Sequence, residues 1–224
     1  MAKLREGEVG TPSPQAVTAP GTKSVLREYA EALIIAILLA LVIRAFVVQA
    51  FKIPSGSMLQ TLEIGDHILV NKFLYYFTSP QRGDVIVFKF PQDESRDFIK
   101  RVIGLPGDTV EVRGKEVLVN GVALLEPYAV YGDVPALRGM ERESVGPLVV
   151  PPGRLFVMGD NRDHSMDSRV WGFLEIAKVK GRAFMIYFSI RSEDIPYTSA
   201  APGIVYVLSH PSIIRWGRLG SLIH

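Results

Sequence analysis

Residues 109–122 read Thr-Val-Glu-Val-Arg-Gly-Lys-Glu-Val-Leu-Val-Asn-Gly-Val, and this stretch decides the fold. Apolar and polar side chains alternate over 109–112, which is the period of a half-buried β-strand. A second short apolar run at 116–119 is followed by Asn120-Gly121, a dipeptide typical of a tight β-hairpin turn. The stretch therefore predicts short antiparallel strands joined by tight turns.

Similar short apolar runs lie on both sides of this hairpin, each bounded by Gly, Pro, Asp or Asn. Turn signals occur at Arg-Gly-Asp (82–84), Leu-Pro-Gly-Asp (105–108) and Pro-Pro-Gly (151–153). Many short strands with frequent turns predict a mainly β fold, built as an antiparallel β-sheet domain. Besides the two runs above, strands are expected at 67–70, 84–90, 98–103, 154–158 and 182–188.

The most hydrophobic part of the chain is residues 30–51, with an uninterrupted apolar run at 32–43. About 20 apolar residues suffice to cross the hydrocarbon core of a bilayer, so this segment predicts an N-terminal transmembrane helix. Lys23 and Arg27 precede it, which favours a cytoplasmic N-terminus. The core of a cleaved signal peptide and a buried helix of a soluble protein are the competing interpretations.

The expected organisation has three parts. Residues 1–22 are rich in Gly, Pro, Thr and Ser, as in a flexible tail. Residues 126–150 lack clean periodicity and are expected to be a variable insertion. The chain then divides into a flexible cytoplasmic tail (1–28), a single-pass transmembrane anchor (29–50) and an extracytoplasmic β-rich domain (51–224).

Composition excludes several classes of function. The 224 residues carry a formal net charge of +2, which is too balanced to indicate nucleic-acid binding. The absence of cysteine excludes disulfides, thiolate metal sites and a cysteine nucleophile. The four histidines form no close ligand pair, so neither a metal nor another cofactor is expected.

Three motifs carry candidate chemistry. In Pro-Ser-Gly-Ser-Met (54–58) a small turn could expose a serine hydroxyl, although the same residues also suit a linker. Lys100 lies in an apolar strand, where desolvation would favour a neutral amine that can accept a proton. The alternative is a lysine on an edge strand in water. The polar run 159–169 suits a solvated turn, an oxygen-ligand metal loop or a buried hydrogen-bonded network.

Four motifs in order, following an apolar segment, resemble the conserved boxes of type I signal peptidases, also called leader peptidases. They are Pro-Ser-Gly-Ser-Met (54–58), Arg-Gly-Asp-Val-Ile-Val-Phe-Lys (82–89), Asp-Phe-Ile-Lys-Arg-Val-Ile-Gly-Leu-Pro-Gly-Asp (97–108) and 159–169 continued by Val-Trp-Gly-Phe. The resemblance covers about residues 28–190. It implies a membrane-bound serine endopeptidase with a Ser-Lys dyad and an acyl-enzyme intermediate. The antiparallel β-sheet domain, residues 51–224, would then be the catalytic peptidase domain.

The resemblance also implies roles for individual residues. Ser57 would be the nucleophile and Lys100 the general base, with Ser165 orienting the amine. The Ser57 N–H and the Ser55 hydroxyl would form the oxyanion hole. A supporting network would comprise Arg101, Asp160, Asp167 and Arg169, and a substrate pocket would comprise Phe51, Ile53, Pro54, Met58, Leu62, Val87, Asp97, Phe98 and Ile99.

The expected partners are the signal peptides of secretory preproteins, membrane lipid and the protein translocation machinery, at the bacterial inner membrane. Two departures from the family pattern are Gln60, where proline is usual, and His164, where asparagine is common. Alternative interpretations are a Ser-His hydrolase that uses His164, a self-cleaving Ser-Lys repressor and a membrane-anchored β-domain binding module without catalytic activity.

Overall fold

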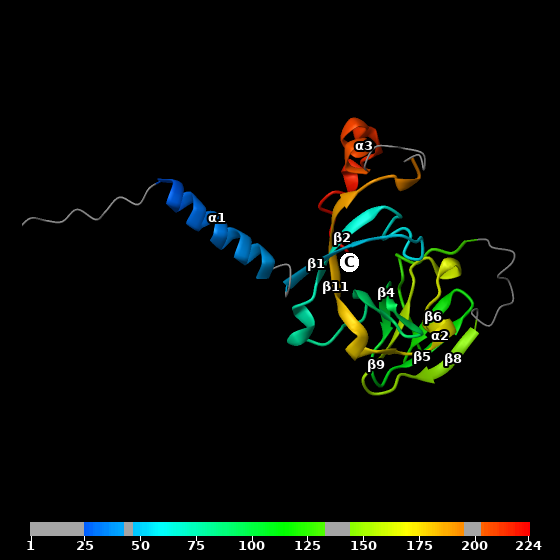
Figure 1. Cartoon of the computed structure of the whole chain (residues 1–224). Coiled ribbons are helices and arrows are strands. Elements are labelled where there is room, and N and C mark those ends of the chain that lie inside the picture. The colour runs from blue at the N-terminus through cyan, green and yellow to red at the C-terminus, as the bar shows by residue number, and fades with distance from the viewer. Residues whose placement is uncertain (1–24, 43–46, 133–143, 195–202) are drawn as a thin grey trace, which may run out of the picture. The chain divides into compact units, whose positions relative to one another are not determined.

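The computed structural model describes residues 25–42, 47–132, 144–194 and 203–224 (Figure 1). The chain divides into two compact units, residues 1–40 and 41–224. In the first unit the described residues belong to helix α1 (Val25–Val42). None of the helices within these four described ranges is both long and apolar enough to cross a membrane.

The second unit is built on two antiparallel sheets. The larger has seven strands in the order β1 (Val48–Lys52), β2 (Asp66–Asn71), β11 (Val179–Ser189), β3 (Val85–Phe90), β4 (Asp93–Gly104), β9 (Arg154–Met158) and β10 (Leu174–Glu175). The smaller has four strands in the order β7 (Val122–Ala123), β6 (Glu116–Val119), β5 (Thr109–Arg113) and β8 (Ser144–Val149). The mainly antiparallel β fold expected from the sequence is confirmed.

Helices in this unit are short. Helix α2 (Ser168–Trp171) follows the polar run, and α3 (Gly203–Ser209) lies near the C-terminus. Single 3-10 turns occupy Leu74–Tyr76, Arg162–His164, Ile176–Lys178, Ser192–Asp194, Pro211–Ile213 and Trp216–Arg218. The strands therefore form the framework, and the polar run, residues 159–169, leads from the end of β9 into the first residues of α2.

The hairpin quoted first has the expected turn. Val119 pairs with Val122 across Asn120-Gly121, which joins β6 to β7. Both turn residues have positive φ, 54° for Asn120 and 79° for Gly121, as a two-residue turn of the type I′ class requires. Each of the other expected strands also lies within a strand of the structure, except that the one expected at 84–90 begins one residue later, at Val85.

Three parts of the expected organisation differ in detail. Residues 25–28, expected in the tail, form the first turn of α1. Residues 48–50, expected in the anchor helix, belong to β1, because the chain there pairs with β2 in a continuous antiparallel register. Residues 144–149, within the expected insertion, form β8 and pair with β5. Residues 1–24, 43–46 and 133–143 lie outside the described residues.

Strand β4 of the larger sheet contributes side chains to all three hydrophobic clusters. The first hydrophobic cluster joins β1, β2, β3 and the loop after β1, and it includes Ile99. The second lies under the four-stranded sheet and includes Ile103, whereas the third contains Val102. Residues 99–104 of β4 are all buried, so any polar side chain among them must find partners inside the protein.

Candidate active site

Ser57 and Lys100 meet in the interior of the second unit. Ser57 lies in the loop between β1 and β2, and Lys100 lies on β4, with Nζ 2.7 Å from Ser57 Oγ. The two residues are only 9% and 3% exposed. Since β4 pairs with β3 on one side and β9 on the other, Lys100 does not lie on an edge strand.

Burial sets the protonation of Lys100. Removal from water lowers the pKa of the Lys100 amine from 10.5 to about 8, against an opposing effect of the Asp167 and Asp160 carboxylates, which raise it. Besides Ser57 Oγ, Nζ has one further hydrogen-bond partner, the carbonyl oxygen of Ile99 at 2.8 Å. At pH 7 a pKa near 8 leaves about a tenth of the amine neutral, and that fraction can accept a proton.

The loop that carries Ser57, residues 53–65 between β1 and β2, is called the serine loop. It is held by its own buried apolar side chains and by Asn161. Met58 and Leu62 are fully buried in the first hydrophobic cluster, and Leu62 N donates to Met58 O at 2.7 Å. Asn161 donates from its main-chain N to Ser57 O at 3.1 Å and from Nδ2 to Gly56 O at 2.9 Å. Asn161 was not expected as a site residue, although it lies within the polar run. It ties the serine loop to that run.

Gly159 allows the two loops to approach each other. A Cβ at this position would overlap Ser165 Oγ and lie 2.5 Å from the carbonyl oxygen of Ser57. Real Cβ contacts are not this short, so a side chain here would push the serine loop away from the polar run. Only glycine fits between Ser57 and Ser165.

Ser165 is placed differently from the expectation. Its Oγ is buried, yet the hydrogen bond expected with Lys100 is not formed, and no described residue partners the hydroxyl. The hydroxyl lies close enough to Asp167 to contribute to the lowering of its pKa. The Ser165 hydroxyl nevertheless makes no hydrogen bond within the described residues. A buried hydroxyl without a partner is costly, so it is a candidate for a role in catalysis.

Arg101 and Asp160 form the centre of a buried ionic network. Arg101 Nε and Nη2 donate to the two carboxylate oxygens of Asp160 at 2.8 and 2.7 Å, and both side chains are almost fully buried. Arg101 also donates to Gly83 O and His224 O, and its guanidinium lies 3.9 Å from the centre of the Tyr128 ring. Such a bidentate, multiply hydrogen-bonded pair fixes β4 against the polar run.

Asp167 and Arg169 form the second part of the network. Burial alone would raise the pKa of Asp167, but the hydrogen bonds and charge of Arg169, together with the Gly159 N–H, lower it below its usual value. Arg169 Nε donates to Asp167 Oδ1 at 2.9 Å, and Gly159 N donates to Oδ2 at 3.0 Å. The ionised Asp167 therefore supplies a negative charge near Lys100. The four expected network residues thus form two ion pairs.

A further buried pair lies outside the expectation. Arg162 donates to both oxygens of Glu126, at 2.7 and 2.6 Å, and its Nε donates to Gly159 O at 3.2 Å. Arg162 lies in the polar run, a signal that could have identified it, whereas Glu126 lies in the expected insertion and no sequence pattern marks it. Arg162 also contacts Tyr131 OH, which donates to Lys115 O.

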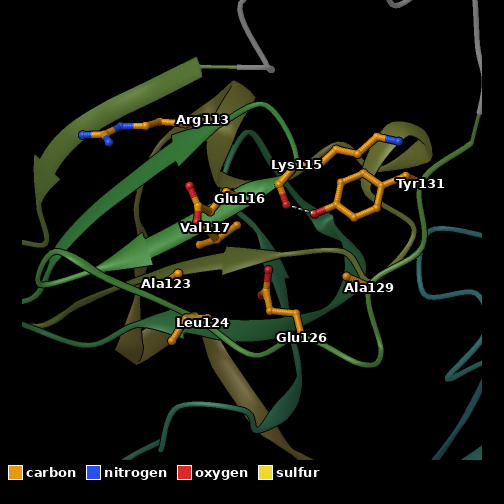
Figure 2. Close-up of a pocket in the computed structure, with 9 residues that line it drawn as sticks. All are labelled: Arg113, Lys115, Glu116, Val117, Ala123, Leu124, Glu126, Ala129 and Tyr131. Carbon is orange, nitrogen blue, oxygen red and sulfur yellow. Dashed lines mark hydrogen bonds between the residues drawn. The ribbon is translucent and has the colours of Figure 1, made fainter.

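Glu126 and Tyr131 also line a cavity, and neither Ser57 nor Lys100 is among its lining residues. Figure 2 shows this cavity of about 430 Å³, with the dashed bond from Tyr131 to Lys115. Charged side chains surround its opening. The remaining lining residues are Arg113, Glu116, Val117, Ala123, Leu124 and Ala129.

The expected oxyanion-hole groups are available. No acceptor among the described residues takes the Ser57 N–H, and Ser55 is exposed. His164 is exposed, and no described residue makes a hydrogen bond to its ring. Its backbone N donates to Asn161 O at 3.2 Å, and no hydrogen bond among the described residues joins the His164 ring to Ser57.

The expected pocket residues divide into two groups. Six gather in the first hydrophobic cluster around the serine loop, namely Phe51, Ile53, Met58, Leu62, Val87 and Ile99. Phe98 instead packs against the third cluster, and its ring lies 5.4 Å from Lys100 Nζ. Pro54 and Asp97 are exposed, and Asp97 pairs with Lys180. Met58 and Leu62 are fully buried, so they support the loop from below.

Residues 26–188 match the family described as signal peptidase, peptidase S26. A signal peptidase I of Pseudomonas aeruginosa is 36% identical, covering 82% of this chain and 80% of that protein. A signal peptidase I of Aquifex aeolicus is 36% identical, covering 86% of this chain and 98% of that protein. A probable signal peptidase I-1 of Synechocystis is 42% identical, covering 90% of this chain and 91% of that protein. A crystal structure of an Enterococcus faecalis signal peptidase I is 40% identical in sequence, with a TM-score of 0.38, and the match covers 47% of this chain and 97% of that one.

The matched range contains all four ordered motifs and both members of the serine–lysine pair. It covers well over half of the chain, and the relatives from three bacteria match along most of their own length. The chain therefore belongs to the peptidase S26 family of signal peptidases, which are serine endopeptidases.

Proposed function

We propose that this chain cleaves signal peptides from exported preproteins, with Ser57 as nucleophile and Lys100 as general base. The observation that carries the proposal is the 2.7 Å contact between a buried lysine amine of lowered pKa and a serine hydroxyl. A desolvated lysine beside a serine is an accepted variant of the serine-base arrangement in hydrolases. The family membership supports the same chemistry.

In the proposed mechanism the neutral amine takes the hydroxyl proton of Ser57 as Oγ attacks the scissile carbonyl carbon. The Ser57 N–H and the Ser55 hydroxyl stabilise the resulting oxyanion, and loss of one such donor typically costs about 10²–10³ in rate. The Lys100 ammonium then gives its proton to the leaving amine, which leaves an acyl group on Ser57. Water, deprotonated by the same amine, releases the signal peptide.

Ser165 is proposed to position the amine. A neutral amine has two N–H groups, one of which reaches Ile99 O at 2.8 Å, and its lone pair must face the Ser57 hydroxyl. The remaining N–H needs an acceptor, and the unpaired Ser165 hydroxyl is buried beside the serine loop. The Ser165 hydroxyl is proposed to be that acceptor during catalysis.

The proposed substrate is an extended segment with small side chains next to the scissile bond. The apolar cluster around Ile53 and Val87 supports the side of the serine loop where such residues would lie. The family resemblance implies small residues at the first and third positions before the cleaved bond. Phe98 and Asp97 are proposed to contact the substrate at the edge of this region.

The proposed location is the bacterial cell membrane. Residues 29–47 would act as a single-pass anchor after a cytoplasmic tail, with the β domain outside and within reach of the translocation machinery. Apolar length and the preceding Lys23 and Arg27 support this orientation. Protease added to the outside of spheroplasts should digest the β domain, and digestion only after lysis would contradict the orientation.

Cleavage of a secretory preprotein tests the proposal directly. Wild type, Ser57→Ala and Lys100→Ala are compared in detergent, with circular dichroism used to check that each chain is folded. The expected result is cleavage after a small-x-small site by wild type alone. His164→Ala serves as the matched control and should cleave normally. Activity in both folded dyad variants, or its loss only in His164→Ala, would refute the Ser-Lys assignment in favour of the alternatives.

A further inference from the structure

Residues 126–131, which we call the clamp segment, contact the polar run through both main chain and side chains. Val130 N donates to Asp160 O, and Arg162 N donates to Val130 O, each at 2.8 Å. Val130 thereby forms a parallel bridge to Asn161. This backbone pairing places the clamp segment against the part of the polar run that holds the serine loop.

Two side chains of the clamp segment meet the buried arginines of the site. Glu126 accepts from Nη1 and Nη2 of Arg162 at 2.7 and 2.6 Å, and the two side chains are 7% and 1% exposed. Arg101 Cζ lies 3.9 Å from the centre of the Tyr128 ring, and the Tyr128 hydroxyl donates to Glu126 at 3.1 Å. A buried bidentate pair of this kind has a narrowly defined geometry. The clamp segment therefore fixes the position of Arg162.

Arg162 carries this restraint to Gly159. Its Nε donates to Gly159 O at 3.2 Å, so the guanidinium holds Glu126 with two nitrogens and the polar run with the third. Gly159 N in turn donates to Asp167 Oδ2 at 3.0 Å. Both polar groups of the Gly159 backbone are therefore held, one by the Glu126–Arg162 pair and the other by Asp167.

Gly159 is the point at which small movements reach the dyad. A Cβ at this position would overlap Ser165 Oγ and lie 2.5 Å from Ser57 O, so the backbone of Gly159 packs directly against both residues. Close-packed groups transmit displacements to their neighbours. Because Ser57 Oγ and Lys100 Nζ are 2.7 Å apart, proton transfer between them tolerates little movement of the serine loop.

We propose that Glu126 is a positioning residue for the Ser57–Lys100 pair. Glu126 holds Arg162, Arg162 holds Gly159, and Gly159 sets the separation between the serine loop and the polar run. The side-chain bonds of Glu126 go to Arg162 and Tyr128, so its effect on the reaction is indirect. The inference rests on the proposed function, because it assigns a further residue to the same reaction.

Two single substitutions in the full-length chain separate positioning from general stability. Glu126→Gln removes the charge and keeps the volume of the side chain. Asp108→Asn is the matched control, because Asp108 also accepts from an arginine, Arg82, at 3.0 Å and its side chain is only 13% exposed. Its other side-chain bonds come from Leu105 and Asn120, which lie outside the site.

Preprotein cleavage in detergent gives kcat and KM, and urea titration gives the unfolding midpoint. Both substitutions should lower the midpoint, but only Glu126→Gln should lower kcat, by about 10- to 100-fold with KM nearly constant. The reason is that a misplacement of about 1 Å can cost about 100-fold in rate. A kcat within about twofold of wild type in folded Glu126→Gln, or an equal loss of kcat in Asp108→Asn, would overturn the proposal.

A double variant decides the question if Glu126→Gln does not fold. In Glu126→Leu/Arg162→Met two apolar side chains replace the ion pair, a change that often preserves the stability of a buried pair. The unfolding midpoint should return towards that of wild type, whereas kcat should stay low because no guanidinium then holds Gly159 O. Recovery of kcat together with the midpoint would show that the pair acts through stability alone.

The protonation of Lys100 gives a readout that needs no turnover. The ¹³C resonance of its Cε, assigned by its loss in Lys100→Met, is titrated in wild type and in Glu126→Gln. Separation of the serine loop from the polar run admits water to the buried amine, so the substitution should raise the pKa of Lys100 towards the usual value of lysine.

This titration separates the two possible failures. If wild type cleaves no preprotein, the proposed function fails. In that case a raised Lys100 pKa in Glu126→Gln still supports the positioning role, and an unchanged pKa removes it as well. If wild type cleaves the preprotein and Glu126→Gln alters neither kcat nor the Lys100 pKa, the positioning role alone is wrong.

Discussion

Replacing Lys100 by methionine should change how stability depends on pH. The side chain of methionine fills similar space without a charge, so the substitution removes the buried amine. Burial lowers the pKa of that amine from 10.5 to about 8. At about 1.36 kcal/mol per pKa unit, this gap means that charged Lys100 destabilises the fold by about 3 kcal/mol.

The direction in which the free energy of unfolding changes with pH follows from the number of protons that the folded and unfolded chains bind. Between pH 8 and 10.5 the unfolded chain holds a proton on Lys100 that the folded chain has lost, so wild-type stability rises with pH across this window. Below pH 8 charged Lys100 destabilises the fold in full, and above pH 10.5 this destabilisation is absent. The free energy of unfolding of Lys100→Met minus that of wild type should therefore fall by about 3 kcal/mol from pH 7 to pH 11. Lost contacts of Nζ shift this difference by a constant and do not alter its slope.

Urea unfolding of the detergent-solubilised chain, followed by tryptophan fluorescence at a series of pH values, measures the difference. Ser57→Ala is the control, since it keeps the amine and should reproduce the wild-type pH dependence. A stability difference for Lys100→Met that stays constant within about 1 kcal/mol across the window would show that the amine is not desolvated, and the basis for a neutral Lys100 would be lost.

Three further results are expected. The value of kcat/KM should rise with pH through an apparent pKa of about 8, because only neutral Lys100 accepts the Ser57 proton; a profile that falls from pH 7 to 9 would contradict this. Arg101→Met should lower the free energy of unfolding by about 3–5 kcal/mol, because Asp160 keeps a buried charge without its partner; the double variant Arg101→Met/Asp160→Leu should recover part of the loss in urea titrations. Ser165→Ala should keep or slightly raise the free energy of unfolding, since it removes a buried hydroxyl without a partner among the described residues. The same variant should lower kcat with KM nearly constant, and an unaltered kcat would exclude the positioning role.

The strands were predictable because their signals are local. Alternation in 109–112 and the Asn120-Gly121 turn depend only on neighbours in sequence, and the structure contains both. The end of the apolar N-terminal segment was harder to predict. Hydropathy continues through residue 51, and only pairing of residues 48–52 with β2 makes this end a strand. Pairing between strands separated by a long loop is a tertiary property that local hydropathy does not contain.

The candidate site likewise combines residues that local motifs identify with contacts that only the tertiary fold creates. Ser57 and Lys100 stand out through their motifs, but their approach to 2.7 Å depends on the loop after β1 folding against β4. The sequence left open an edge-strand position for Lys100, and the pairing of β4 with both β3 and β9 removes it. Glu126 has no periodic context, so its buried pair with Arg162 emerges only from the fold.

Two buried ion pairs hold the polar run, residues 159–169, in place. Asp160 and Asp167 each face an arginine, and each also accepts a further hydrogen bond, from Thr61 Oγ1 and Gly159 N. Buried pairs of this quality need not add net stability, but breaking one leaves an unpaired charge. Strict pairing therefore favours one arrangement of the loop that carries Ser165, close to Ser57.

Detection of an acyl group on Ser57 tests the central claim most directly. The chain is mixed with a peptide ester that ends in alanine, quenched in acid within the first turnover and analysed by mass spectrometry of its proteolytic fragments. The account predicts an adduct of the acyl mass on Ser57 in wild type and none in Ser57→Ala or Lys100→Ala. An adduct on another residue, or turnover of the ester with no adduct and undiminished activity in Ser57→Ala, would contradict it.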